Sequence, residues 1–145
     1  MIIEAQKEDL AIAAALAALL WSDHSTRSLT EELNQILCKD GARIFLKYEG
    51  ATPVGFAQCQ VRHDYVEGTK TSPVGYLEGI FVKEGFRCKG YAKALLSACE
   101  EWARANGCRE FASDCEIVNE SSFLFHKATG FTEANRIICF TKQLS

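Results

Sequence analysis

The residues best suited to chemistry form a basic, glycine-containing turn, RCKGYA, at residues 87–92. The turn follows a strand-like apolar run and precedes a helix-like run, so its backbone N–H groups would open a helix. A helix N-terminus attracts anions, and Gly90 allows a ligand to approach the backbone closely. Arg87, Lys89 and Lys93 add positive charge. The pattern predicts a site for a phosphate ester, although a solvated basic turn would have the same composition.

Two common phosphate-binding motifs do not fit this turn. A Walker-type loop needs Lys-Ser or Lys-Thr after its second glycine, but Tyr91 and Ala92 follow Gly90. A dinucleotide fingerprint needs glycines in the pattern G-x-G-x-x-G, and the glycines here are isolated. The sequence therefore predicts a phosphate-ester site that uses neither of these motifs.

Two carboxylates lie in or at the end of strand-like runs. Glu78 interrupts the otherwise apolar segment YLEGIFV, where a charged side chain either binds something or faces solvent. Asp114 ends a short β-rich run, where a turn residue is also common. A carboxylate can accept a proton from an ammonium group or hold that group by a charge-assisted hydrogen bond. The pattern alone leaves both interpretations open at both positions.

The elements that must position these residues alternate along the chain. Apolar residues at helical spacing predict helices at 9–21 and 90–105, and a capping-box match beginning at Ser28 predicts a helix between them. Two β-rich runs, 42–48 and 54–65, predict a hairpin. The other expected elements are strands at 2–4, 76–82, 110–114 and 136–143 and a helix at 119–129. This order favours one α+β domain over residues 1–145, a sheet layered with helices.

Composition excludes several classes of protein. The chain has 145 residues and is 48% hydrophobic, which is enough for one buried core, and its formal net charge of −3 argues against a nucleic-acid-binding face. The seven cysteines are an odd number without a C-x-x-C pair, which favours free thiols in a reducing compartment over a zinc site. No signal peptide or membrane-length apolar run is recognisable. We expect a cytoplasmic protein without a metal.

Two segments match a known family. Residues 87–92 resemble the R/Q-x-x-G-x-G/A signature of the GCN5-related N-acetyltransferases (GNAT), and residues 119–131 resemble the family segment N-x-x-A-x-x-[FL]-Y … G-F. The resemblance implies the GNAT fold, a central mixed and mostly antiparallel sheet flanked by about four helices, with acetyl-CoA as co-substrate. The segments RHDYVEG, SPVGYLEGIFV, GCREFASD and ESSFLFHKATGF further resemble aminoglycoside 6'-N-acetyltransferases, which acetylate the 6'-amino group of kanamycin-like and neomycin-like antibiotics and so confer resistance.

The resemblance implies a function for each matching residue. Glu78 and Asp114 would be the catalytic and substrate-binding carboxylates, one accepting the ammonium proton and the other fixing the antibiotic, with the division left open. Trp21 and Tyr65 match substrate-lining aromatic residues, although the spacing of Trp21 alone favours core packing. The backbone N–H of Val82 would polarise the thioester oxygen. The residues implied to bind acetyl-CoA are Ile80, Phe81, Val82, Cys88, Lys89, Gly90, Tyr91, Ala92, Lys93 and Asn119.

Two positions depart from the family pattern. His126 stands where most members have a tyrosine proposed to protonate the thiolate, but its apolar neighbours favour a structural histidine, so it is a weak acid candidate. Asn135 stands where close relatives carry an acidic residue, and a neutral amide removes one partner for an ammonium group. His24 and His63 have no usable partner spacing and are interpreted as surface or packing residues.

Three functions fit these observations. The first is acetyl transfer to an aminoglycoside, directly within a ternary complex. The second keeps the fold but acetylates another small amine, a polyamine or a protein amino group. The third is a non-catalytic acyl-CoA-sensing module, which the acidic pair disfavours. Family habit and the exposed edge of the expected last strand favour a homodimer.

Overall fold

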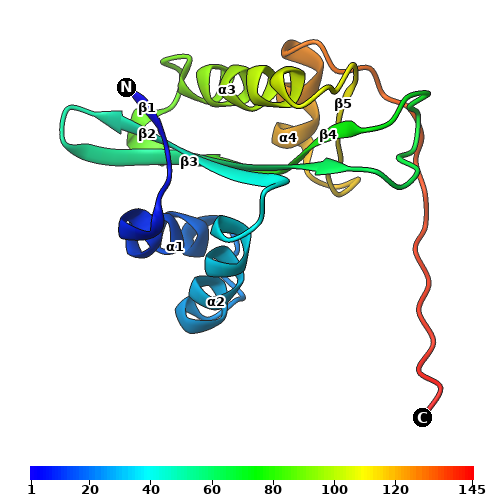
Figure 1. Ribbon diagram of the computed structural model, residues 1–145, viewed down its shortest axis with the longest axis horizontal. Helices are drawn as coiled ribbons and strands as arrows, with labels where there is room; N and C mark the ends of the chain where they lie inside the picture. The colour runs from blue at the N-terminus through cyan, green and yellow to red at the C-terminus, as the bar shows by residue number, and fades with distance from the viewer.

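A five-stranded sheet forms the centre of the molecule, with its strands in the order β1-β2-β3-β4-β5 (Figure 1). In the computed structural model, which describes all residues from 1 to 145, the strands are β1 Ile2–Glu4, β2 Ala42–Glu49, β3 Thr52–Arg62, β4 Val74–Val82 and β5 Phe111–Ser113. Neighbouring strands are antiparallel except β4 and β5, which are parallel. The expected mixed, mostly antiparallel sheet is confirmed.

Helices cover both faces of this sheet (Figure 1). The helices α1 Leu10–Leu20 and α2 Thr26–Leu37 lie on one face, and α3 Tyr91–Ala105 and α4 Glu120–Ala128 lie on the other. Two short 3₁₀ helices, η1 Lys7–Asp9 and η2 Glu84–Phe86, precede α1 and α3. The four expected helices are therefore present.

The alternation of β3 gives each helical layer its own core. Phe56 points into the cluster beneath α1 and α2, whereas Ala57 and Cys59 belong to the cluster beneath α3. Successive strand residues face opposite sides of a sheet, so one strand supplies both clusters. Ala13 and Ala17 of α1 are fully buried, and these small side chains let the helix pack close to the sheet.

A β-bulge interrupts β4 at Glu78. Gln58 pairs with Gly79 and Cys59 pairs with Leu77, so Glu78 is an extra residue without a partner on β3. Such a bulge changes which face the following side chains occupy. Leu77 belongs to the α3-side cluster, and Glu78 lines a cavity on the α1–α2 side. Gly79 packs on Trp21 on that same α1–α2 side, so the bulge places two successive residues on one face before the alternation resumes.

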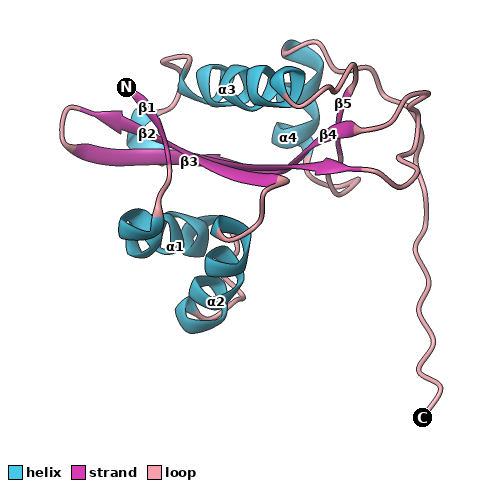
Figure 2. Ribbon diagram, viewed as in Figure 1, coloured by secondary structure: helices cyan, strands magenta, loops and turns pink.

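The predicted start of α2 and the predicted last strand are wrong. Helix α2 begins at Thr26, not behind Ser28, because the Ser25 side chain accepts a hydrogen bond from the Ser28 N–H at 3.0 Å and caps the helix one turn earlier. No strand forms at 136–143; this segment extends away from the body of the domain (Figure 2). This segment pairs with no strand of the sheet, and an isolated strand cannot satisfy its backbone hydrogen bonds.

All seven cysteines are free thiols, and Cys59 and Cys99 lie buried together beneath α3. A hydrogen bond to Cys59, together with burial, raises the pKa of the Cys99 thiol well above its ordinary value. No helix has the length and apolar character needed to cross a membrane.

Candidate active site

A cavity of about 330 Å³ opens between the sheet and the two N-terminal helices. Trp21, at the end of α1, and Glu78, at the bulge of β4, share this cavity. The remaining lining residues come from α2, the turns before and after it, and β3: His24, Glu32, Leu33, Gln35, Ile36, Lys39 and Gln58. An aromatic wall beside a carboxylate suits a polar, cationic acceptor.

Trp21 reaches this position by packing against Gly79. A Cβ atom on Gly79 would lie 2.7 Å from two carbon atoms of the Trp21 ring, so only glycine allows this contact. The ring also meets Phe56 edge to face, with centroids 5.8 Å apart. Trp21 is therefore both a packing residue and part of the cavity wall.

The Glu78 carboxylate is held by two side chains of β3. Arg62 donates from Nη2 to both carboxylate oxygens, at 3.0 and 2.8 Å, and the Gln60 amide donates to Oε2. The Glu78 side chain is 20% exposed and that of Arg62 is 37% exposed. Glu78 therefore lines the cavity as part of an ion pair with Arg62.

Asp114 follows β5 and connects to the same network through Tyr76. The Tyr76 hydroxyl donates to Asp114 Oδ2, and the Arg62 guanidinium lies 3.5 Å from the centre of the Tyr76 ring. Burial, reinforced by the bond to Asp114, raises the pKa of Tyr76, so the hydroxyl stays protonated at neutral pH. Asp114 is exposed and does not line the cavity that contains Glu78.

A second cavity, of about 290 Å³, lies where the chain passes from β4 into α3. The side chains of Val82 and Phe86 form one part of its wall, and α4 contributes Phe125 and Ala128. The basic turn supplies most of the rest: Arg87, Cys88, Gly90, Tyr91, Ala92 and Lys93. Six of the ten predicted acetyl-CoA residues thus line one cavity: Val82, Cys88, Gly90, Tyr91, Ala92 and Lys93.

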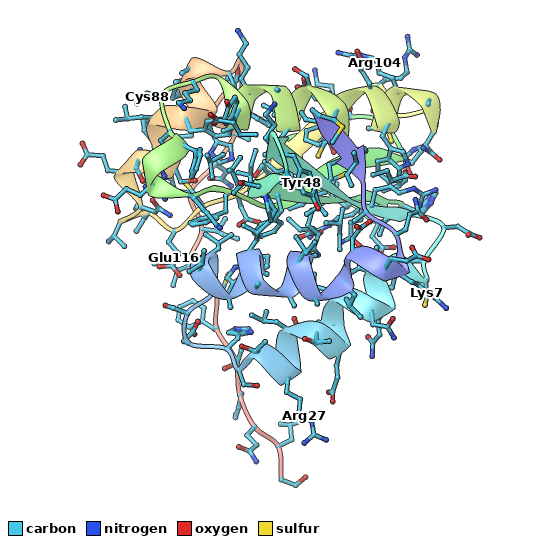
Figure 3. All side chains as sticks on the ribbon, turned by 90° about the vertical axis from the view of Figure 1, so that its left-hand side faces the viewer. Lys7, Arg27, Tyr48, Cys88, Arg104 and Glu116 are labelled. Carbon is cyan, nitrogen blue, oxygen red and sulfur yellow. The ribbon has the colours of Figure 1, made fainter.

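The turn before α3 has the geometry of an anion-binding loop. Cys88 and Gly90 have positive φ angles of 65° and 80°, and Gly90 is the N-cap of α3 without a side chain that could occupy the helix N–H groups. Figure 3 shows Cys88 in the turn at the start of the helix. Left-handed residues in such a turn direct successive N–H groups inward, and the 15-residue helix adds its dipole. A pyrophosphate fits these donors.

The edge of β4 that faces β5 is open along the segment between the two cavities. Strand β5 pairs only with Gly75, Tyr76 and Leu77, so the strands separate before Glu78. The Lys83 N–H donates to the Val54 carbonyl of β3 at 2.8 Å. Because successive N–H groups of a strand point to opposite sides, that of Val82 points away from β3, toward the open edge. Its carbonyl is occupied, since Arg87 Nε donates to it at 2.8 Å.

The open edge of β4 is followed along the chain by the basic turn on the N-terminus of α3. The profile of the acetyltransferase (GNAT) family matches residues 13–131, which include both. The chain belongs to the GNAT family of acetyltransferases.

Relatives of this GNAT chain carry the name aminoglycoside N(6')-acetyltransferase type 1. The protein of Stenotrophomonas maltophilia is 41% identical over 143 residues, which are 97% of this chain and 92% of that protein. The protein of Salmonella typhimurium strain LT2 is 40% identical over 124 residues, 86% of each chain. The family expected from the motifs is confirmed.

Solved GNAT structures are also similar. AAC(6')-Iy in complex with the bisubstrate analogue CoA-S-monomethyl-acetylneamine has a TM-score of 0.95 and 38% identity, covering 99% of this chain and 97% of that one. AAC(6')-Ih from Acinetobacter baumannii has a TM-score of 0.93 and 36% identity, covering 100% and 99% of the two chains. These similarities confirm the GNAT fold.

Several residues expected in the GNAT site lie outside both cavities. Tyr65 is 77% exposed in the loop after β3, which ends at Arg62 and not at Tyr65 as the β-rich run predicted. Lys89 pairs with Glu49 at 3.3 Å. Asn119 caps α4, where its Oδ1 accepts from the Ser122 N–H at 3.2 Å. Ile80 and Phe81 follow the bulge on β4, and their side chains pack in the cores on opposite faces of the sheet.

The two family departures have partners of their own. The Nδ1 of His126 lies 2.7 Å from the Ser122 carbonyl, which can only accept, so Nδ1 carries a proton, and Nε2 lies 2.8 Å from the Ser113 hydroxyl. His126 also packs edge to face on Phe131. Asn135 donates to Glu67 at 3.2 Å, away from both cavities. These contacts favour structural functions for both residues.

Sequence reasoning did not select the polar residues of β3. Gln58, Gln60 and Arg62 occupy every second position of the strand. Gln58 lines the cavity that contains Trp21 and Glu78, called the acceptor cavity below, and Gln60 and Arg62 donate to Glu78. Polar residues at every second position of a long β-rich run are a recognisable signal of a polar sheet face. His24, interpreted as a surface or packing residue, also lines the acceptor cavity.

Proposed function

We propose that the protein transfers the acetyl group of acetyl-CoA to the 6'-amino group of aminoglycoside antibiotics, and so confers resistance to them. The observation that carries this proposal is the placement of two cavities against one strand. Trp21 and Glu78 line one of them, and Val82 with the basic turn lines the other. The relatives with the same name, and the solved relative that holds a CoA–acetylneamine analogue, support the same acceptor.

Each part of the donor site has a definite task in this reaction. The turn at 87–92 holds the pyrophosphate through backbone N–H groups, with Lys93 adding charge. The open edge of β4 holds the pantetheine arm, together with Asn119, and the Val82 N–H donates to the thioester oxygen. When bound, acetyl-CoA supplies an activated acyl group with a thiolate as leaving group.

The acceptor site must deliver a neutral amine. The 6'-ammonium loses two protons as the N–C bond forms and the C–S bond breaks; one ends on the CoA thiolate and the other is released. Glu78 and Asp114 bind the ammonium group and accept its proton, while Trp21 supports the sugar ring. Tyr65 contacts the acceptor from its loop. No acetylated enzyme is formed, because the amine attacks the bound thioester directly.

An assay of thiol release by the purified protein tests this function. The sharpest acceptors are a matched pair of aminoglycosides that differ only at C6', one with an amine and one with a hydroxyl. Turnover of the first alone supports the proposal. Turnover of both, or turnover only of a polyamine, another small amine or a protein amino group, contradicts it. The acylation state is checked by the intact mass of the protein after incubation with acetyl-CoA alone, where an acetyl adduct would contradict direct transfer.

We also propose that the protein acts as a cytoplasmic homodimer. Its C-terminal segment exposes four large apolar side chains: Ile137, Ile138, Phe140 and Leu144. A β-forming segment with such side chains gains stability by pairing with a sheet edge of a second copy. The seven free thiols suit a reducing compartment.

A further inference from the structure

Arg62 is the central residue of the network that joins the two acidic residues. Its Nη2 donates to both oxygens of Glu78, at 3.0 and 2.8 Å. Its guanidinium plane also covers Tyr76, whose hydroxyl donates to Asp114. Glu78 lies on β4 and Asp114 follows β5, and the side chains of Arg62 and Tyr76 link them. One internal cation therefore influences both carboxylates.

The two carboxylates differ in how many hydrogen bonds their oxygens accept. Both oxygens of Glu78 accept from Arg62, and Oε2 also accepts from Gln60. Asp114 accepts one hydrogen bond, at Oδ2 from Tyr76, which leaves Oδ1 open on an exposed residue. Glu78 is thus fixed in direction and balanced in charge, whereas Asp114 has an oxygen available for a new partner.

The bulge makes Arg62 necessary for this arrangement. As the extra residue of β4, Glu78 has no cross-strand neighbour on β3 that would set its direction. Its side chain is directed instead by Arg62 and Gln60, which reach it from neighbouring positions on β3. A planar guanidinium that is itself stacked on an aromatic ring has little freedom to move. It is a rigid support for the carboxylate.

We propose that Arg62 is a positioning residue that gives the two carboxylates different tasks: it fixes Glu78 as the anion that binds the acceptor ammonium group, and it leaves Asp114 to accept the proton. The proposal rests on the acceptor function proposed above. Arg62 acts through Glu78 and does not touch the reacting atoms. Removing Arg62 should therefore weaken acceptor binding more than it slows the chemical step.

Steady-state kinetics with kanamycin and acetyl-CoA test this assignment. Arg62→Gln should raise the KM for kanamycin about tenfold and change kcat less than about threefold, and Arg62→Lys should recover part of the loss. Asp114→Asn should instead lower kcat at least about tenfold. In a Glu78→Gln background, Arg62→Gln should add less than about twofold, because no carboxylate remains to be held.

Arg43→Gln is the matched control. Arg43 forms an ion pair with Glu4 at 2.7 Å, with an exposure similar to that of Arg62. Its guanidinium lies over Trp102 of α3, on the face of the sheet opposite to Glu78, and its removal should leave both kinetic constants unchanged. A lower KM for kanamycin in Arg62→Gln would overturn the proposal, because Arg62 would then merely repel the acceptor. An undiminished effect in the Glu78→Gln background would also overturn it. If wild-type protein does not acetylate kanamycin, the proposed function itself fails, and the Arg62 assignment with it.

Discussion

Trp21 packs against Gly79 so closely that no room is left for a Cβ atom there. The contact joins the end of α1 to the residue after the bulge of β4. Because the ring also packs edge to face on the buried Phe56, a displacement of the indole would disturb the core. One glycine therefore determines where the aromatic wall of the acceptor cavity stands.

Gly79→Ala should displace Trp21. The added Cβ would approach the ring to 2.7 Å, and an overpacked site of this kind costs about 1–3 kcal/mol of unfolding free energy. We expect a lower melting temperature and a KM for aminoglycoside raised about tenfold, with the KM for acetyl-CoA nearly unchanged. Gly41→Ala is the control, because no atom lies within 4 Å of its added Cβ. Equal kinetics in the two variants would contradict the importance of this contact.

Gly90→Ala should affect the other substrate. Gly90 has a φ of 80° and nothing lies within 4 Å of an added Cβ, so the effect is conformational and not steric. A left-handed residue with a side chain costs about 1–2 kcal/mol, which the turn can relieve by changing shape. We expect calorimetry to show weaker CoA binding, by about tenfold, together with a small loss of stability. Unchanged CoA affinity would show that the N–H groups of this turn do not hold the pyrophosphate.

Glu110→Gln should reduce the acid sensitivity of the fold. Hydrogen bonds from the Thr71 side chain and from the Lys70 and Thr71 backbone N–H groups lower the pKa of Glu110. A carboxyl whose pKa is depressed by folding stabilises the protein above its unfolded pKa, near 4.3, and this contribution disappears as the pH falls through the folded value. Wild type should therefore melt above the variant at neutral pH, and the difference should shrink below about pH 4.

The matched control is Glu116→Gln, at an exposed glutamate in the loop before α4. It should leave the pH dependence of the melting temperature unchanged. Parallel curves for wild type and Glu110→Gln from neutral to acid pH would contradict the contribution assigned to Glu110.

Deletion of residues 136–145 should produce a monomer. The deletion removes the exposed apolar side chains of the C-terminal segment but keeps the Asn135–Glu67 hydrogen bond. Sedimentation at micromolar concentration should show a dimer for the full chain and a folded monomer for the shortened one. A full-length monomer would contradict the proposed dimer, and a shortened dimer would place its interface elsewhere.

Periodicity and turn chemistry made most of the fold predictable. The apolar stripe of α3, its glycine N-cap and the hairpin of β2 and β3 are local features, and local features are readable from the sequence. The last strand was not predictable in the same way. Residues 136–143 have β-forming side chains, but a strand also needs a neighbour, and no edge of the same chain is paired with it.

The candidate site was predictable only in part for a related reason. The motif resemblance selected Glu78 and Asp114, but not the side chains that hold them. Arg62 meets Glu78 because of the register of β3 against β4 and the bulge between them. A bulge depends on the pairing of two strands, so no local pattern reveals it. The sequence signal that could have indicated Arg62 was the polar alternation of β3.

Because of the bulge, the number of residues in β4 determines which face of the sheet its side chains occupy. Leu77 before it and Val82 after it both face α3, although they are five positions apart and a regular strand would place them on opposite faces. Deletion of a single residue from β4 would move every side chain on one side of the deletion to the opposite face of the sheet. A deletion in β4 is therefore more disruptive than most substitutions in it, whereas the turn after Glu49 can accept insertions.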